Sequence, residues 1–284
     1  MRRLLLGLLC LCLSSAVLAY GPNAVRKRVE ASLLVSGSIV VATDGSVSDC
    51  AIDQPDKLPP GVIDLVKKTS VSWKFEPVLI DGRPSIAKAT MNLRVVAKKQ
   101  DGEAYAISIR SAHFGEDDRP KALSNKKRFV FPKYPIDAIR NRVAGTVYLA
   151  LLINAQGQVA DVEAEQVNLN VVLSDAGMDH WRRILADAAR EAAKQWTFNT
   201  PTSGPYAHAD HWVVRAPVNF SLDDVAHPAS NGYGKWDVYI PGPMQSVPWL
   251  DQKRNAPLGV DALPAGELAQ VGDELHLISP LAGS

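Results

Sequence analysis

Two stretches of the chain share one order of hydrophobic and polar positions. Residues 36–41 and 144–149 are runs of apolar and β-branched residues, and each leads through a glycine corner, Asp44-Gly45 or Gln156-Gly157, into a second such run. Runs of this kind on both sides of a glycine corner are typical of a β-hairpin. Further along, residues 89–96 and 213–222 have the composition of another strand. The pattern therefore predicts one small α+β module that occurs twice.

Each predicted hairpin is followed by a predicted helix. In the second copy Ser174 or Asp175 can cap a helix whose apolar positions recur at helical spacing through 180–195. In the first copy Pro59-Pro60 can open a shorter helix. Its expected buried residues are Ile63, Val66 and Val71. A third, short helix is predicted at 134–139, ahead of the second hairpin. Trp73 and Trp196 follow the two main helices, and a place in the core is favoured over a peptide-stacking role for both.

The remaining segments complete a division of the chain into five parts. Residues 29–114 form the first module, with an extra strand at 105–109, and the polar stretch 115–133 is interpreted as a linker. Residues 134–223 form the second module. The tail, residues 224–284, is rich in proline and glycine and has no long periodic segment, which predicts an irregular extension folded back by its aromatic residues.

The first 19 residues have the pattern of a secretory signal peptide. Arg2 and Arg3 precede an apolar run, and small residues lie before a cleavage point after Ala19. The run is shorter than the roughly 20 residues that a spanning helix needs, so a retained anchor and a lipoprotein are the less favoured alternatives. The pattern predicts export to the periplasm, with membrane contact only through a partner or an uncleaved signal.

Composition narrows the classes of function. The chain has 31 Lys plus Arg, 30 Asp plus Glu and 46% hydrophobic residues. Cleavage after Ala19 would remove two arginines, and so near-balanced a charge argues against nucleic acid as a partner. Two of the three cysteines, Cys10 and Cys12, would also be removed, which leaves Cys50 and no internal disulfide.

No catalytic, metal or cofactor site is predicted. His208 and His211 are the only close histidine pair. On a strand their spacing would direct them to opposite faces, whereas in a loop their geometry is open. Cys50 has no basic residue nearby in sequence and is interpreted as a structural thiol. Nucleophile-elbow, phosphate-loop and zinc-helix motifs do not occur in the sequence. An enzyme of unrecognised type remains an alternative.

A set of residues in the second copy carries a family resemblance. The set is Tyr134-Pro135, Ala138, Gly145-x-Val147, Gly157-x-Val159, Trp196-x-Phe198, Pro201, Gly204 and Pro217-Val218-x-Phe220-x-Leu222. In order and spacing it resembles the TonB carboxy-terminal domain over residues 134–223. A weaker resemblance at 29–98 rests on Gly37, Asp44-Gly45, Trp73-x-Phe75, Pro77 and Gly82-x-Pro84.

The resemblance implies a fold and a mode of binding. Each of two tandem α+β modules would have a three-stranded antiparallel sheet with helices packed on one face. The last strand, residues 212–222, would lie at a sheet edge and accept an extended peptide from an outer-membrane receptor. The expected partner-binding residues are Trp212, Val214, Arg215, Asn219 and Ser221.

Two further expectations concern the role of the whole chain. A retained membrane helix and a long proline-rich spacer, which an energy-coupling TonB protein uses, are not recognised in the sequence, so a periplasmic adaptor linked to outer-membrane transport is favoured. The alternative is a structural envelope protein whose sheet edges are already covered by the tail or by the first module.

Overall fold

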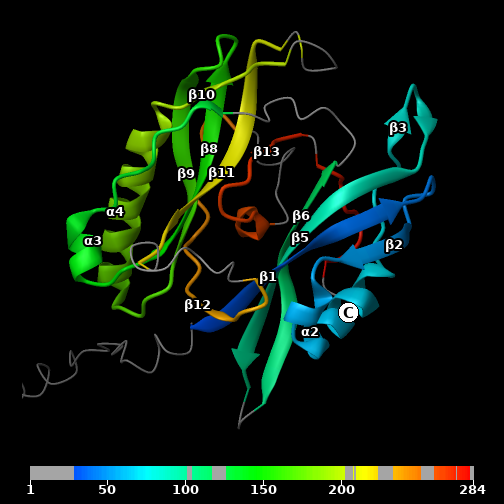
Figure 1. Cartoon of the computed structure of the whole chain (residues 1–284). Helices are drawn as coiled ribbons and strands as arrows, with labels where there is room; N and C mark the ends of the chain where they lie inside the picture. Colours follow the sequence, from blue (N-terminus) through cyan, green and yellow to red (C-terminus); the bar gives the residue numbers. More distant parts are fainter. Residues whose placement is uncertain are drawn as a thin grey trace, which may run out of the picture.

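The chain folds around two antiparallel sheets, each with its own hydrophobic core. The computed structural model describes residues 29–100, 104–116, 126–201, 207, 209–222, 233–250, 259–272 and 274–281. Figure 1 shows the sheets side by side, with α4 on the outer side of one and α2 beside the other. A short helix of the tail, η3 (Val260–Ala262), lies between the sheets and contacts β5, β6 and β9. The fold is therefore α+β with antiparallel sheets, as predicted.

The first sheet has the strand order β12-β1-β5-β6, with β2 also paired to β1. Its strands are β1 (Glu30–Val41), β2 (Val47–Ile52), β5 (Ala87–Lys99), β6 (Tyr105–Glu116) and β12 (Asp237–Tyr239). Between β2 and β5 the chain forms η1 (Pro55–Lys57), α2 (Pro60–Ser70) and the small hairpin β3 (Leu79–Ile80) and β4 (Arg83–Pro84). The core of this unit includes Trp73, Phe75 and Phe114, whose rings pack edge to face.

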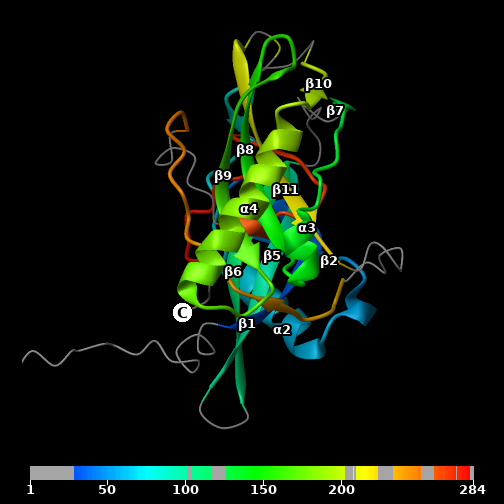
Figure 2. The ribbon, with the colours of Figure 1, turned by 90° about the vertical axis from the view of Figure 1, so that its left-hand side faces the viewer.

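The second sheet has the order β13-β11-β8-β9. Its strands are β8 (Gly145–Asn154), β9 (Val159–Leu169), β11 (His211–Phe220) and β13 (Ala269–Gln270). Helices α3 (Ile136–Arg140) and α4 (Asp175–Ala193) lie on one face, which Figure 2 turns toward the viewer. A separate pair joins β7 (Lys126–Arg128) to β10 (Thr197–Phe198), so a strand lies within the segment interpreted as a linker.

The two main helices begin where their capping residues indicate. The Ser174 hydroxyl accepts a hydrogen bond from the Gly177 amide at 3.3 Å, so Ser174 caps α4. Helix α2 begins at Pro60, as predicted. The prediction that Val71 is buried was wrong: α2 ends at Ser70, and Val71 is 78% exposed. Trp73 and Trp196 are each 1% exposed, which places both in the cores.

Both sheets have more than the three strands that the resemblance implies. Strand β6 extends the first sheet past β5, in the place of the extra strand predicted at 105–109, and the tail contributes β12 to the first sheet and β13 to the second. The tail was expected to be irregular, but its described residues also supply buried side chains to both cores, among them Ile240 and Leu277. Its segments are two or three residues long, too short to produce a periodic pattern in the sequence.

The hairpin glycines are required by both backbone conformation and space. Gly157 has φ +78°, and a Cβ there would lie 2.1 Å from the carbonyl oxygen of Phe198. Gly45 has φ +84°, and its Cβ would lie 2.1 Å from the carbonyl oxygen of Phe75. Each phenylalanine also donates its backbone amide to the carbonyl of the glycine that it contacts. The distance is 2.7 Å from Phe198 to Gly157 and 2.8 Å from Phe75 to Gly45.

We expect Gly157→Ala to lower the free energy of unfolding by about 3 kcal/mol, because the side chain is strained and also displaces a backbone carbonyl. Gly266→Ala is the matched control. Gly266 has a similar φ, +85°, but a Cβ there meets nothing within 4 Å. The Gly266→Ala substitution should lower the free energy of unfolding by only about 1 kcal/mol. Urea denaturation measures both, and equal losses would show that the contact with Phe198 contributes nothing.

Candidate functional site

Strand β11 lies between β8 and the tail strand β13. It pairs with β8 over its whole length, from His211 opposite Asn154 to Phe220 opposite Gly145. On its other side Val214 and Arg215 lie opposite Gln270 and Ala269. The Val271 amide extends this pairing, because it donates to the Val213 carbonyl at 2.9 Å. The expected edge strand is therefore the last strand of its module, but the tail occupies the first half of its edge.

Two of the predicted partner-binding residues lie in the core. Trp212 is 5% exposed and Val214 is 1% exposed, and both pack in the same cluster as Trp196 and Leu185. Side chains on a strand alternate between faces, so even-numbered residues of β11 face α4. These two side chains cannot contact a partner without unfolding of the module.

Arg215 projects from the opposite face and is also buried, with 2% of its side chain exposed. Its guanidinium donates two hydrogen bonds to the Glu165 carboxylate of β9, from Nε to Oε2 at 2.8 Å and from Nη2 to Oε1 at 3.2 Å. Its third nitrogen, Nη1, donates to Oε1 of Glu274 in the tail at 3.3 Å. Glu165 is 1% exposed. In this bidentate geometry the attraction between the two buried charges can offset the free-energy cost of their desolvation.

Asn219 and Ser221 lie at the far end of the strand. Asn219 is exposed, and its side-chain oxygen accepts a hydrogen bond from the Thr146 hydroxyl at 3.2 Å. Ser221 is half-buried. Since Val213 and Arg215 direct their backbone groups to β13, alternation directs those of Pro217 and Asn219 to the same edge. Pro217 has no amide to donate, which makes this half a poor template for uncontrolled pairing.

His113 of β6 extends the Arg215 cluster to the first sheet. Its Nδ1 lies 3.6 Å from Oε1 of Glu274. Burial, and then the nearby Arg215 charge, lower the pKa of His113 to about 4. The imidazole is therefore neutral at pH 7. Burial raises the pKa of Glu274, against the opposing effect of Arg215.

The lowered pKa of His113 predicts acid destabilisation. The unfolded chain takes up this proton near pH 6.5 and the folded chain near pH 4, so the free energy of unfolding decreases as the pH falls between these values. The full effect is about 3 kcal/mol. Glu274, with its raised pKa, acts in the opposite direction, so the measurement compares wild type with His113→Asn by denaturation from pH 7 to pH 4. Between pH 7 and pH 4 the wild type should lose about 3 kcal/mol more stability than His113→Asn, and parallel curves would contradict this account.

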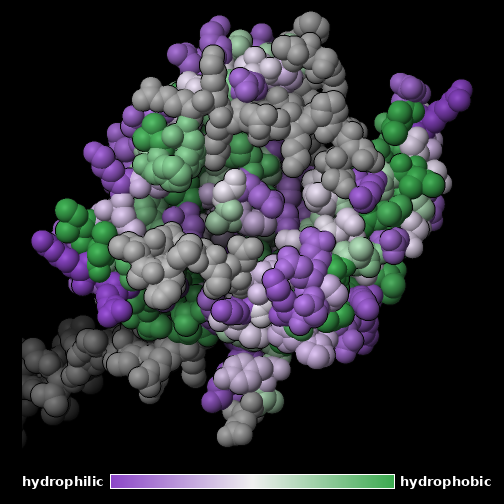
Figure 3. Space-filling view, viewed as in Figure 1, coloured by the Kyte–Doolittle hydropathy of each residue, from purple (hydrophilic) through white to green (hydrophobic). Residues whose placement is uncertain are grey.

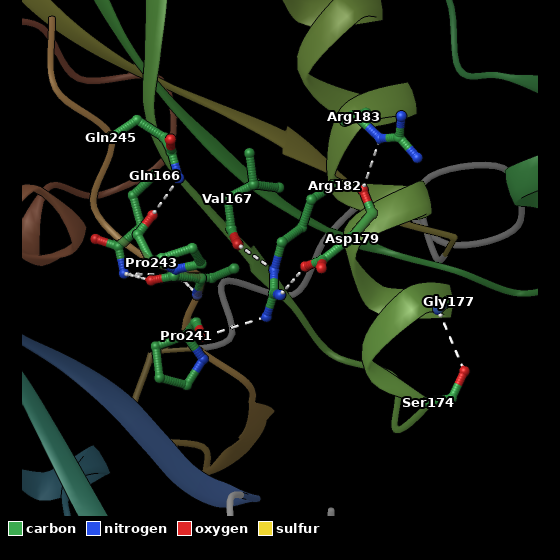
Figure 4. A network of polar contacts seen from close by, with 12 residues as sticks. Gln166, Val167, Ser174, Gly177, Asp179, Arg182, Arg183, Pro241, Pro243 and Gln245 are labelled. Carbon is green, nitrogen blue, oxygen red and sulfur yellow. Dashed lines mark hydrogen bonds and ion pairs between the residues drawn. The ribbon is translucent and has the colours of Figure 1, made fainter.

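The tail also covers the outer edge of β9. Leu169 and Ile240 exchange two backbone hydrogen bonds, at 3.1 and 2.9 Å, and the Gln245 amide donates to the Glu165 carbonyl at 2.7 Å. Arg182 of α4 also contacts this tail segment, at Pro241. Its guanidinium donates to the carbonyls of Val167 and Pro241 and to the Asp179 carboxylate (Figure 4). Both edges of the second sheet are thus met by the tail.

A buried aspartate connects the tail to both sheets. The Asp261 carboxylate accepts hydrogen bonds from Ser111 of β6 at 2.6 Å, from Asn168 of β9 at 3.3 Å, and from the Tyr239 hydroxyl. Its backbone carbonyl accepts from Nε of Arg94 at 2.8 Å. Asp261 is 3% exposed, and every one of these donors lies outside η3. This residue therefore links β5, β6, β9 and β12 through one helix of the tail.

The cavities and surface patches of the described residues lie beside the tail or away from β11. A cavity of about 540 Å³ lies between α4, β9 and residues 243–248, and two of its three arginines, Arg182 and Arg190, already contact carboxylates. Exposed apolar side chains gather on the β3–β4 hairpin and on α3, both visible in Figure 3. Neither patch adjoins the β11 edge in Figure 1.

The described residues contain no group of three or more His, Cys, Asp or Glu placed to hold a metal ion. Of the predicted histidine pair, His208 lies outside the described residues, as does the predicted signal peptide. Cys50 is half-buried, and burial raises the pKa of its thiol, so a reactive thiolate is disfavoured. No helix of the described part is long and apolar enough to span a bilayer.

Sequence reasoning identified Arg215 but not its partners Glu165 and Glu274, nor Asp261. A lone arginine between Val214 and Ala216 in an apolar strand does carry a signal, because a charge at such a position requires a buried counter-charge. The sequence does not say where that counter-charge lies. Glu274 is 59 residues away, in a segment with no recognisable periodicity.

The fold and this edge define a class: a small α+β module whose final strand pairs with the tail along only part of its outer edge. Comparison with known proteins identifies the family. Residues 131–222 match the family described as "Gram-negative bacterial TonB protein C-terminal". Residues 131–222 are therefore similar to the TonB C-terminal domain.

Two curated relatives match the same region. The proteins named "Protein TonB" of Xanthomonas campestris pv. campestris, from strain B100 and strain ATCC 33913, are each 37% identical over 92 residues. The match covers 32% of this chain and 35% of each relative, so the chain spans about a third of the length of the relatives it matches. No solved structure matches the chain.

Proposed function

We propose that the chain is a TonB-like adaptor of the cell envelope, exported to the periplasm, which captures an extended peptide segment of a partner by strand addition. The partner class is a protein of outer-membrane transport. The observation that carries the proposal is the family match of residues 131–222, whose last strand, β11, is paired by the tail strand β13 along only part of its outer edge. An unpaired rim offers amides and carbonyls that an incoming strand can satisfy. Nucleic acid, a cofactor and catalysis have no part in this proposal.

We infer further that the two sheets derive from one duplicated module. The order β1, β2, α2, β5 corresponds to β8, β9, α4, β11, and in both units the first of these strands lies between the other two. The hairpin glycines support the correspondence, because Gly45 contacts Phe75 as Gly157 contacts Phe198. In the first unit β6 covers the strand that corresponds to β11. The proposed binding edge therefore belongs to the second unit alone.

A structural role is the second candidate function, and a specific observation favours it. The tail already pairs with β11 through Val271 and with β9 through Ile240. If this cover is permanent, the chain is an envelope protein without a free strand site.

Photo-crosslinking in living cells separates the two functions. A photoreactive aromatic residue at Asn219 would report any strand that joins the outer half of the β11 edge. The control position is Asp187, which is exposed on α4 and remote from that edge. A crosslink to an outer-membrane transport protein from Asn219, and none from Asp187, is the expected result. No crosslink from either position, or the same products from both, would contradict peptide capture.

A further inference from the structure

The tail segment on β11 has the properties of a ligand rather than of a permanent strand. Its pairing is short, with two residues in register and one further hydrogen bond from Val271 to Val213 at 2.9 Å. Strand pairing in a stable sheet is typically about 5–6 residues long. The side-chain oxygen Oε1 of Gln270 is buried without a hydrogen-bond partner among the described residues, which is unfavourable.

Glycines flank this segment, and its outer neighbours are anchored separately. Gly266 and Gly272 have φ +85° and +97°, and neither has an atom within 4 Å of a Cβ position. Before Gly266, Leu263 is 3% exposed, and after Gly272, Leu275 is 6% exposed and donates its amide to the Phe114 carbonyl at 2.8 Å. We call residues 266–272 the strap. Its two glycine ends can absorb backbone rotation while the anchors on both sides stay in place.

The strap ends beside the carboxylate that contacts Arg215. Arg215 has two hydrogen bonds to Glu165 of β9, outside the tail, whereas its Nη1 donates to Glu274 of the tail at 3.3 Å. A buried guanidinium is unfavourable when one of its donors loses its acceptor. Any segment that replaces the strap therefore binds best if it brings an acceptor, and a carboxylate is the strongest one.

We propose that the strap is an internal occupant of the partner site, which the partner must displace together with the side chain of Glu274, whose backbone stays bridged to Gly115. The partner segment is then an extended peptide with a small residue opposite Arg215, as Ala269 is, followed by a carboxylate that takes the place of Glu274. This inference rests on the proposed function and adds to it a regulated, self-occupied state. Because the strap belongs to the same chain, it competes with a partner for the β11 edge at an effective concentration in the millimolar range. A partner therefore binds this edge only if its affinity or its local concentration is high enough to displace the strap.

The test uses the mature full chain and a labelled synthetic peptide of residues 265–276 as the probe. Val271→Pro removes the amide that bonds Val213, and we expect this variant to bind the peptide at least tenfold more tightly than wild type. A peptide with Glu274→Ala should bind at least tenfold more weakly than the unaltered peptide. Fluorescence anisotropy measures both. Equal, negligible binding by wild type and variant would overturn the inference.

A reversible lock provides the matched control. Val214→Cys and Gln270→Cys, in a Cys50→Ser background, place two thiols at directly opposed positions of β11 and β13. The oxidised protein should not bind the peptide, whereas the same protein after reduction should bind it as wild type does. The reduced form shows whether the substitutions themselves disturb the fold. Equal binding by the oxidised and reduced forms would overturn the inference.

The lock also separates this inference from the proposed function. A disulfide persists in the oxidising periplasm, so the Asn219 crosslink can be repeated in cells with the locked chain. Loss of the crosslink on locking supports displacement. A crosslink that persists in the locked chain overturns displacement and leaves peptide capture intact. A crosslink absent from both wild type and the Val271→Pro chain overturns peptide capture.

Discussion

Replacing Arg215 with methionine should lower the free energy of unfolding by about 3–5 kcal/mol, the largest single effect expected in this protein. The substitution leaves the Glu165 carboxylate, which is 1% exposed, without its counter-charge, and Glu274 loses its hydrogen-bond donor. Urea denaturation followed by circular dichroism measures the loss. Arg183→Met is the matched control, because Arg183 is exposed on α4, and it should change stability by less than about 0.5 kcal/mol.

A second variant tests whether the loss comes from the stranded charge. Combining Arg215→Met with Glu165→Gln removes both ions, so the double variant should recover a large part of the stability lost in the single variant. A double variant as unstable as the single one would assign the loss to packing rather than to the buried pair.

Replacing Asp261 with alanine should lower the free energy of unfolding by about 3 kcal/mol and weaken the coupling between the two sheets. The change leaves the hydroxyl groups of Ser111 and Tyr239 and the amide of Asn168 without their shared acceptor in a buried site. Because Ser111 lies in the first sheet and Asn168 in the second, unfolding should lose its single-step character. Tryptophan fluorescence and circular dichroism, recorded against urea, then give separate transitions.

Asp187→Ala is the control for this variant. Asp187 is an exposed carboxylate that pairs with Arg190 on α4, and its loss should change stability by less than about 0.5 kcal/mol and leave the transitions coincident. Coincident transitions in the Asp261 variant as well would show that the tail does not couple the sheets through this residue.

Local signals in the sequence predicted most of the helices and strands of the two main sheets. The corners at Gly45 and Gly157 predicted both hairpins, because each glycine has a positive φ that other residues adopt with strain. Ser174 predicted the start of α4, and its hydroxyl does cap the helix. Trp196 was assigned to the core because it follows a helix, and its indole donates to the Val130 carbonyl at 2.8 Å from within that core.

Long-range contacts of short segments were beyond prediction from the sequence. Strand β13 is two residues long, and its partner Val214 is 56 positions away, so neither alternation nor a turn motif indicates the pairing. Trp212 was expected at an open edge, although its side chain is 5% exposed and lies in the same core cluster as Trp196 and Leu185. Arg215 was expected to contact a partner, whereas its counter-charge, Glu165, lies inside the same module.

Amide hydrogen exchange of the mature protein tests most directly whether the tail occupies the β11 edge. The Val271 amide, bonded to Val213, and the Leu275 amide, bonded to Phe114, are the two reporters. The account predicts that both are protected in the resting protein and that Val271, within the strap, exchanges faster than Leu275, which is anchored. Exchange of Val271 at the rate of an unstructured peptide would contradict occupation of the edge by the tail.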